Sequence, residues 1–150
     1  MKSTSAASFE RHLQQACQLR DPSALIRLMI KDAVWRDNDA VHVGREEIWS
    51  ALSNKWASAL HCTLNREVVS CDEMSVVIRF DSEWQHSVRG RWYRTSGRVR
   101  ASFNDHGHVT KVESQLTVKP ISVSDRRLAI PVGATRSQNS ANEILRGKDQ

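Results

Sequence analysis

The sequence predicts one α+β domain, in which helices come first and a strongly curved antiparallel sheet follows. Apolar residues recur at helical spacing as far as Leu60, and from His61 onward the apolar period becomes two. Turn residues separate the predicted strands, as in a meander of hairpins. The chain has 150 residues, 39% of them hydrophobic and 26% charged, which suits a single globular domain with a substantial core.

Three helices are expected before the sheet. Ser8 is a good N-cap for the first helix and Asp21 for the second, where Pro22 suits the first helical position. Gly44 precedes the third helix, and acidic residues in its first turn favour the helix dipole. Apolar residues at four-residue steps mark the core-facing side of this third helix: Ile48, Leu52, Trp56 and Leu60.

Extended segments account for most of the remaining chain. A short extended piece over 33–36 and a turn at Asp37-Asn38-Asp39 separate the second and third helices. Longer strands are expected over residues 64–69, 75–85, 91–103 and 109–118, and Gly97 predicts a bulge or bend in the third of them. We expect residues 1–8 to be flexible, residues 9–130 to form the domain and residues 131–150 to be a polar, mobile tail.

Composition narrows the class of protein. The first nine residues have no apolar stretch typical of a signal peptide, and no run is long enough to cross a membrane, so a cytoplasmic protein is expected. The net charge is +5, but the basic residues are scattered and no nucleic-acid motif accompanies them. The three cysteines and six histidines form no ligand pattern, so buried thiols are favoured over disulfides and no metal site is predicted.

Two segments resemble a known superfamily. Asp32 to Asp37 and Gly44 to Ile48 resemble the hallmark stretch of the nuclear transport factor 2-like superfamily, which includes SnoaL-like proteins and steroid isomerases. There, a strand ends near the mouth of a cone-shaped cavity, and Gly-Arg-Glu opens the next helix. A branch of uncharacterised members is similar over about residues 9–129, through these pieces: Lys55-Trp56, Val77-Ile78-Arg79-Phe80, Glu83-Trp84, Trp92-Tyr93-Arg94 with Gly97, Pro120-Ile121 and Asp125-Arg126.

The resemblance implies a cone-shaped α+β barrel with an internal pocket and a homodimer formed through the sheet. It implies no activity, because the branch has none assigned. The chain also departs from the branch, which usually carries Asn where this chain has Asp37, Glu at Val99 and Trp at Ala101. The branch also ends its last strand with Ser-Ile-Asn-Asp where this chain has Gln115 to Val118. Part of the relatives' site is therefore lost or exchanged in this chain.

Asp37 is the first candidate for catalysis. It aligns with the catalytic base of the steroid isomerases, and a carboxylate at a pocket mouth can take a carbon-bound proton next to a carbonyl. The two positions that align with the isomerases' oxyanion donors are Leu13 and Val99, neither of which can donate, so that mechanism does not transfer as a whole. Alternatively, Asp37 only shapes the turn. His42, just after this turn, is a second candidate base.

Arg79 and Glu83 lie four residues apart on one predicted strand face. They form either an ion-pair ladder on the wet outer face of the sheet or a buried pair in the cavity, where Arg79 would bind an oxyanion. The matching branch keeps both residues, which favours the cavity. Alternation then places Ile78, Phe80 and Trp84 on the opposite face; if these apolar residues face the cavity instead, Arg79 and Glu83 are surface residues.

The hypothesis for function is a cofactor-independent isomerase, dehydratase or cyclase that acts on a small, mainly apolar, oxygenated molecule. Asp37 or His42 would be the base, and Arg79 would stabilise the oxyanion. The alternative is a non-catalytic ligand-binding or dimerisation module. Six residues are candidates for lining the ligand site, with core packing or an exposed rim as the alternative for several of them: Trp35, Arg36, Trp56, Trp84, Trp92 and Arg94.

Overall fold

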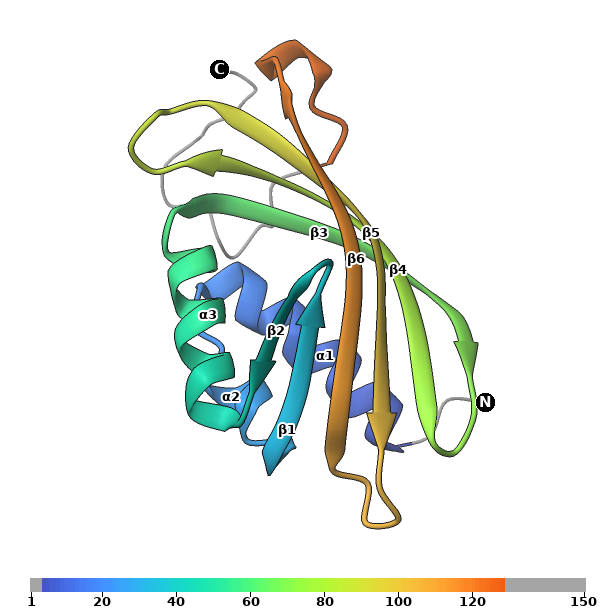
Figure 1. Cartoon of the computed structure of the whole chain (residues 1–150). Coiled ribbons are helices and arrows are strands. Elements are labelled where there is room, and N and C mark those ends of the chain that lie inside the picture. Colours follow the sequence, from blue (N-terminus) through green and yellow to red (C-terminus); the bar gives the residue numbers. More distant parts are fainter. Residues whose placement is uncertain (1–3, 129–150) are drawn as a thin grey trace.

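Helices and strands follow one another in the predicted order, except for one further strand over Ala40–Val43 that was not predicted. The computed structural model describes residues 4–128, and Figure 1 shows the arrangement. The elements are α1 (Thr4–Leu19), α2 (Ser23–Ile26), β1 (Met29–Asp37), β2 (Ala40–Val43), α3 (Arg45–Ala57), β3 (Ala59–Cys71), β4 (Ser75–His86), β5 (Trp92–Phe103), β6 (Val109–Ile121) and the 3-10 turn η1 (Val123–Asp125).

The strands form one curved sheet of six, in the order β2-β1-β6-β5-β4-β3. Neighbouring strands are antiparallel except β1 and β6, which pair in parallel. The predicted α+β class is confirmed, with two differences of detail. The sheet is mixed because of the path of the chain. After the β1–β2 hairpin, α3 leads to β3 at the opposite edge of the sheet, and the antiparallel strands β3 to β6 then return until β6 pairs with β1. It is also an open sheet with β2 and β3 as its edges, so the expected barrel is not closed.

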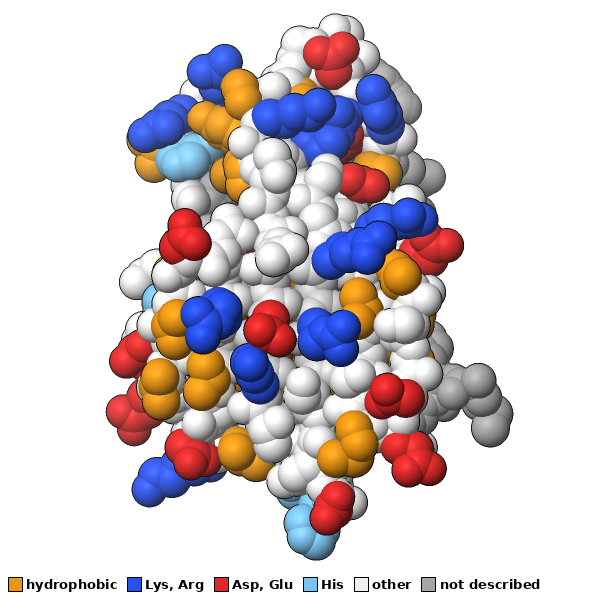
Figure 2. Space-filling model, turned by 45° about the vertical axis from the view of Figure 1, so that its right-hand side comes forward, with side chains coloured by type: hydrophobic (Ala, Val, Ile, Leu, Met, Phe, Trp, Pro, Cys, Tyr) orange, Lys and Arg blue, Asp and Glu red, His pale blue; other side chains and the backbone are white. Residues whose placement is uncertain are grey.

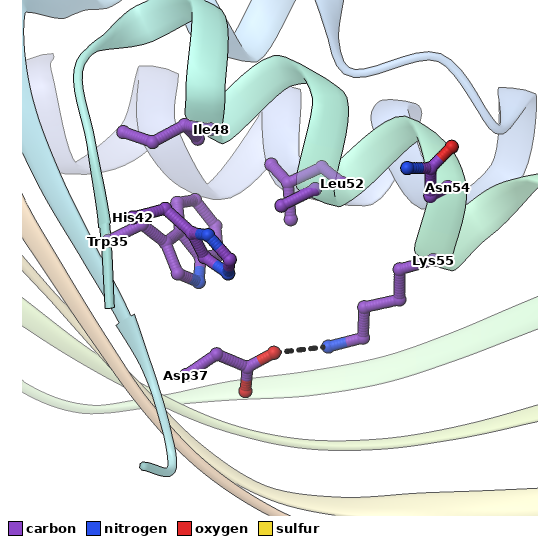
Figure 3. Close-up of a pocket in the computed structure, with 8 residues that line it drawn as sticks. Trp35, Asp37, His42, Ile48, Leu52, Asn54 and Lys55 are labelled. Carbon is purple, nitrogen blue, oxygen red and sulfur yellow. Dashed lines mark hydrogen bonds and ion pairs between the residues drawn. The ribbon is translucent and has the colours of Figure 1, made fainter. Parts of the chain in front are cut away.

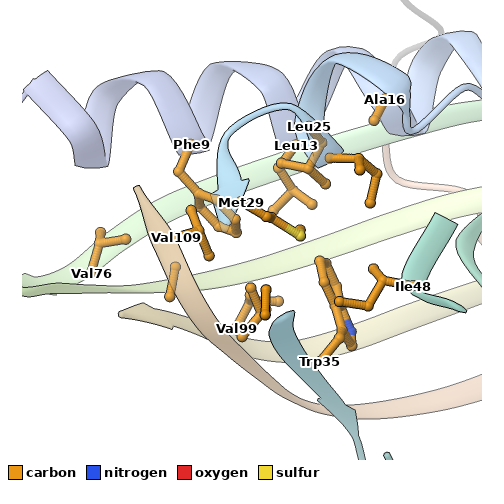
Figure 4. Packing of buried hydrophobic residues seen from close by; sticks show 14 of the residues in the cluster. Phe9, Leu13, Ala16, Leu25, Met29, Trp35, Ile48, Val76, Val99 and Val109 are labelled. Carbon is orange, nitrogen blue, oxygen red and sulfur yellow. The ribbon is translucent and has the colours of Figure 1, made fainter. Parts of the chain in front are cut away.

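The hydrophobic core lies between the helices and the concave face of the sheet (Figure 4). Phe9 and Leu25 from the helices and Val76 and Ile78 from β4 are fully buried and belong to the same core cluster. Phe9 also meets Phe103 edge to face, with ring centroids 6.5 Å apart. Fully burying such a side chain contributes about 1.5–3 kcal/mol, so this apolar layer fixes which face of each strand points inward.

Element boundaries differ from the predictions near the helices. α1 begins at Thr4 rather than at Ser8, so residues 4–8, predicted to be flexible, are helical. α2 is a single turn, and Met29 begins β1 instead of continuing the helix. α3 ends at Ala57, which leaves Leu60 in β3. The spacing of apolar residues could not predict where these helices end and the strands begin, because the same apolar residues suit both a helix face and a buried strand. The predicted tail, residues 131–150, lies outside the described residues.

Gly97 is required by close packing of two strands rather than by a bulge. The β4–β5 and β5–β6 pairings run through it without a change of register. A Cβ atom at this position would overlap with the backbone carbonyl oxygen of Gln115 on β6. Of the predicted bulge or bend, the continuous register excludes the bulge, and only a residue without a side chain allows this approach of β5 and β6.

Charged side chains of both signs cover the outside. On the face shown in Figure 2, basic and acidic side chains are both present, and basic side chains predominate in the upper half of the view. None of the helices among residues 4–128 is long and apolar enough to span a membrane.

Candidate functional site

A half-open cavity of about 430 Å³ lies between α3 and the β1–β2 hairpin (Figure 3). Its wall is apolar at Ile48, Ala51 and Leu52 of α3 and polar toward the end of β1 and the C-terminal end of α3. The lining residues are Trp35, Asp37, His42, Ile48, Ala51, Leu52, Asn54 and Lys55. A volume of this size suits a small organic ligand, and a mainly apolar wall with a few polar groups is typical of binding sites for such molecules.

Strand alternation places three polar groups in this cavity. In β1, Trp35 and Asp37 are two residues apart and therefore point to the same, concave face. His42 lies directly opposite Trp35 in the antiparallel β1–β2 pairing, so its side chain faces the same way. The short hairpin thus brings the two candidate bases of the sequence analysis, Asp37 and His42, into one cavity.

One face of α3 completes the wall. Ile48 and Leu52 are buried and form the apolar part, and Lys55 follows one turn later on the same face. Its ammonium group therefore reaches the cavity from the end of the helix, opposite the end of β1 (Figure 3).

Two side chains hold the Asp37 carboxylate. The Nζ of Lys55 donates to Oδ2 over 3.1 Å, and the hydroxyl of Ser114 donates to Oδ1 over 2.9 Å. Ser114 is placed by the parallel pairing of β1 with β6, in which it lies opposite Asp37. The Asp37 side chain is 25% exposed. A carboxylate has about four acceptor positions, so these two contacts leave it with capacity for a ligand.

The turn after β1 is held by Asn38 and not by the Asp37 carboxylate. Asn38 has the left-handed backbone conformation, with φ of 53°. Its amide exchanges hydrogen bonds with the backbone of Leu116, at 3.1 Å to the carbonyl oxygen and 2.8 Å from the amide nitrogen. The alternative that Asp37 only shapes the turn is therefore not needed to explain the turn geometry.

Trp35 has an unpaired donor. Its side chain is buried, with 4% exposure, and no hydrogen-bond acceptor for its Nε1 is found among residues 4–128. Figure 3 shows this nitrogen on the edge of the indole that faces the cavity. Leaving a buried donor without a partner costs about 1–3 kcal/mol, and such groups are rare in folded proteins.

His42 is tied to the start of α3. Its Nδ1 lies 3.6 Å from Oε2 of Glu47, the same oxygen that accepts a 3.0 Å hydrogen bond from the backbone nitrogen of Val43. The His42 side chain is 29% exposed, so it stands at the open side of the cavity rather than at its base.

Arg79 and Glu83 lie outside this cavity. The core-facing side of β4 carries Ile78, and alternation places both charged residues on the opposite, convex face of the sheet. Arg79 is exposed and forms an ion pair with Glu67 of β3. The placement of the pair in the cavity, which the resemblance favoured, is thus contradicted by the burial of Ile78.

Glu83 instead anchors the segment that follows β6. It is fully buried, and its Oε2 accepts hydrogen bonds from Arg94 Nε at 3.2 Å and Nη2 at 2.8 Å. The backbone nitrogens of Arg127 and Leu128 donate to the same carboxylate at 3.0–3.1 Å. Arg94 also donates to the carbonyl oxygen of Asp125 over 2.7 Å. These contacts pin residues 125–128 against the convex face.

Aromatic and basic groups complete this second cluster. The Arg126 guanidinium lies 4.0 Å from the ring centroid of Trp92, and the ring of His61 stacks on the same indole at 6.4 Å. Burial lowers the pKa of His61, and the positive charges of Arg126 and Arg20 lower it further. Trp92 and Arg94, both candidate ligand residues, therefore serve here rather than in the cavity.

The other candidate ligand residues are dispersed. Arg36 is exposed on the convex side of β1. Trp56 packs against the core. Trp84 stacks on Tyr93 with ring centroids 4.8 Å apart, and its Nε1 donates to Thr95 Oγ1 over 3.0 Å. Of the ten candidates, the structure brings three together in the cavity: Trp35, Asp37 and His42.

Sequence reasoning missed two functional neighbours of Asp37. Lys55 belongs to one of the pieces that carry the resemblance, which was a signal, but nothing in local spacing connects it to a residue 18 positions earlier. Ser114 carried no signal, because its contact depends on the unforeseen parallel pairing of β1 and β6.

Solved structures with the same fold bind or process small molecules. Rv0760c from Mycobacterium tuberculosis has a TM-score of 0.66 at 14% identity, over 79% of this chain and 99% of that one, and a second structure holds estradiol-17beta-hemisuccinate. The epoxide hydrolase/cyclase-like enzyme SalBIII of salinomycin formation has a TM-score of 0.64 at 10% identity, over 75% and 93%. A computationally designed 17-OHP binder reaches 0.63 at 16%, over 78% and 98%.

Similarity at these identities shows the fold alone, which is that of the nuclear transport factor 2-like superfamily. None of the functionally curated proteins matches the chain. The model of one protein family, described as "Protein of unknown function (DUF1348)", matches residues 1–129. This match covers most of the chain and includes every helix and strand of the structure, so the protein belongs to the DUF1348 family.

Proposed function

We propose that this protein is a cofactor-independent enzyme of the isomerase, dehydratase or cyclase type, in which Asp37 is the general base. The observation that carries the proposal is the position of the Asp37 carboxylate, which is oriented by two side chains and still has free acceptor capacity beside a cavity. The cavity wall at Ile48 and Leu52 suits a small, mainly apolar ligand. Steroid-like ligands bound by proteins of the same fold support this ligand class.

The contacts of Asp37 fit proton transfer. Lys55 and Ser114 hold the carboxylate in one orientation, so less conformational entropy has to be lost when the carboxylate approaches a substrate than for an unrestrained side chain. A base in this position can take a proton from a carbon next to a carbonyl and return it elsewhere on the same molecule. His42 stands at the open side, where it can exchange protons with solvent. Arg79 has no part in this reaction because it lies on the convex face, away from the cavity.

Exchange of carbon-bound hydrogen tests the proposal without knowledge of the natural substrate. β-Tetralone has acidic hydrogens next to its carbonyl, and their replacement by deuterium in D₂O is followed by proton NMR. We expect the wild-type protein to accelerate this exchange above the uncatalysed background. Asp37→Asn should lower the acceleration by about 10²–10⁴-fold, the usual contribution of a general base.

Asp39→Asn is the matched control for this experiment. Asp39 is an exposed carboxylate two residues away in the same turn, so its removal changes the local charge equally without touching the cavity. Equal exchange rates for Asp37→Asn and wild type would refute the role of Asp37. A loss of exchange in Asp39→Asn as large as in Asp37→Asn would point to a general charge effect instead.

A non-catalytic ligand-binding module is the second candidate, because both oxygens of Asp37 already have partners. Such a module would be stabilised by a ligand at a hundred times its dissociation constant by about 2.7 kcal/mol, yet would not exchange the ligand's hydrogens. Thermal shift and exchange measured on the same compounds therefore separate the two candidates. The homodimer that the resemblance implies stays a prediction.

A further inference from the structure

We infer that the indole N–H of Trp35 is the hydrogen-bond donor for a carbonyl oxygen of the ligand, which makes carbonyl compounds the substrate class of this cavity. The catalytic part of this inference rests on the proposed role of Asp37, whereas the binding part stands on the geometry of Trp35 alone. Sequence comparison offered no such donor, because the positions that would supply one are Leu13 and Val99.

The first support is the missing partner. The Trp35 side chain is 4% exposed, and Nε1 has no acceptor among residues 4–128. Other indoles of the chain show that the fold can supply one. Trp84 donates to the hydroxyl of Thr95 at 3.0 Å, and Trp49 donates to the hydroxyl of Ser23 at 3.3 Å. Trp35 Nε1 is thus the buried indole nitrogen that lacks an acceptor among residues 4–128, and its side chain lines the cavity, where a ligand can satisfy it.

The second support is the chemistry of the group. An indole N–H can only donate, so it selects a ligand atom with a lone pair. The group is neutral and rigid, and Ile48 and Leu52 line the same cavity with apolar side chains, which suits an uncharged carbonyl oxygen on an apolar skeleton. Because the indole is shielded from water, its hydrogen bond to the ligand oxygen would also become stronger as negative charge develops on that oxygen.

The third support is the distance along the strand. Trp35 and Asp37 are two residues apart on one face of β1, so their Cα atoms are separated by roughly 6.6 Å. A carbonyl oxygen held by the indole therefore places the neighbouring carbon toward the Asp37 carboxylate. Lys55 and Ser114 keep that carboxylate from turning away.

The reaction that follows is balanced within the ligand and Asp37. The carboxylate takes a proton from the carbon next to the carbonyl, and the electron pair of the C–H bond forms a C=C bond to the carbonyl carbon. The π pair of the C=O bond moves to oxygen, and the enolate oxygen is stabilised by the Trp35 N–H. Protonated Asp37 then returns the proton to a carbon of the enolate, which restores the carbonyl and regenerates the carboxylate.

The binding test compares two ligands and two proteins. β-Tetralone and tetralin have the same ring skeleton and differ only by a carbonyl oxygen in place of two hydrogens. Trp35→Phe keeps an aromatic ring and removes the N–H donor. We expect Trp35→Phe to weaken binding of β-tetralone by about three- to tenfold, as the loss of one neutral hydrogen bond should, and to change tetralin binding less than about twofold.

Trp84→Phe is the matched control, because it removes an indole donor that already has a partner in Thr95. It should leave the affinity for β-tetralone unchanged. An equal loss of affinity for both ligands in Trp35→Phe would overturn the inference, since the indole would then serve only as an apolar wall. Failure of the wild-type protein to bind β-tetralone would also overturn it.

NMR on the wild-type protein keeps the test valid if Trp35→Phe folds poorly. The chain has five tryptophans and therefore five indole N–H signals. β-Tetralone should shift the signal of Trp35 downfield, and tetralin should not. A ketone that binds without moving any indole signal contradicts the inference.

The outcomes separate this inference from the proposed function. Ketone binding that depends on Trp35 without deuterium exchange would leave the binding inference standing and refute Asp37 as a base. The opposite result is deuterium exchange that is lost in Asp37→Asn, while Trp35→Phe changes neither exchange nor ketone binding. That result would support Asp37 as the base and refute the binding inference for Trp35.

Discussion

Asp37 and Glu83 are two carboxylates that hydrogen bonds hold on opposite faces of the sheet, in different surroundings. Glu83 is fully buried on the convex face, and Arg94 and two backbone amides fill its acceptor positions. Asp37 is 25% exposed on the concave face, has two partners and borders a cavity. A carboxylate whose hydrogen-bonding capacity is used up by its own chain holds structure together, whereas one with spare capacity beside open space is free to bind a ligand.

The same contrast applies to the aromatic residues. On the convex face, the Trp92 ring is covered by Arg126 and stacked with His61, so its surface is used by the fold. In the cavity, the Trp35 N–H is left without a partner among the described residues. Of the tryptophans predicted to line a ligand site, Trp35 of β1 borders the cavity, whereas Trp92 of β5 does not.

The largest expected effect on stability is that of Glu83→Gln. It leaves the buried Arg94 guanidinium without its counter-charge, and breaking a buried pair in this way costs about 3–5 kcal/mol. Urea denaturation measures the loss, and ketone binding in the cavity should persist in the folded fraction because the cavity does not include Glu83.

Glu67→Gln is the control for that comparison. It breaks the pair with Arg79, in which both side chains are more than half exposed, and should cost no more than about 1 kcal/mol. A Glu83→Gln protein as stable as Glu67→Gln would mean that the Glu83 cluster does not anchor residues 125–128.

The Asp37–Lys55 pair should contribute much less. Both side chains are partly exposed, at 25% and 39%, so water and salt screen the interaction. A double-mutant cycle with Asp37→Asn and Lys55→Met, followed by urea denaturation, should give a coupling of about 0.2–1 kcal/mol. This coupling energy should diminish in molar salt, whereas the loss of unfolding free energy in Glu83→Gln should not.

A larger coupling would weaken the contrast between the two carboxylates. If the cycle gave a value comparable with the cost of Glu83→Gln, Asp37 would be a structural anchor as well, and its proposed role in proton transfer would lose support. A small coupling combined with lost deuterium exchange in Asp37→Asn would sharpen the contrast.

The sequence predicted the sheet better than the site. Period-two alternation located β4, β5 and β6 and separated Ile78 from Arg79, because alternation follows directly from strand geometry. It did not say which face would point inward, and the resemblance favoured the wrong one for Arg79 and Glu83. The decision depended on where α1 packs, which is a property of the whole fold.

Contacts between distant segments account for the rest. Asp37 was predicted because it follows a short strand at an aligned position, but its partners come from α3 and β6. The segment after β6 carries one of the pieces of the resemblance, Asp125-Arg126, but nothing in its sequence predicted that the backbone amides of Arg127 and Leu128 complete the Glu83 site. Backbone donors carry no sequence signal, so such a site is found only once the chain is folded.

The smallest expected effect concerns pH and the convex face. The pKa of His61 is lowered from 6.5 by burial and by the charges of Arg126 and Arg20. The folded protein therefore binds this proton less readily than the unfolded chain, so the contribution to stability is complete above pH 6.5 and is lost as the pH falls through the lowered pKa. His61→Asn should make the fall of the unfolding free energy on acidification shallower; Asn tolerates the left-handed conformation of this residue, with φ of 53°. His106→Asn, in an exposed turn, is the control and should retain the wild-type dependence of the unfolding free energy on pH. If His61→Asn also retained it, the positive charge of Arg126 near Trp92 would not oppose protonation of His61.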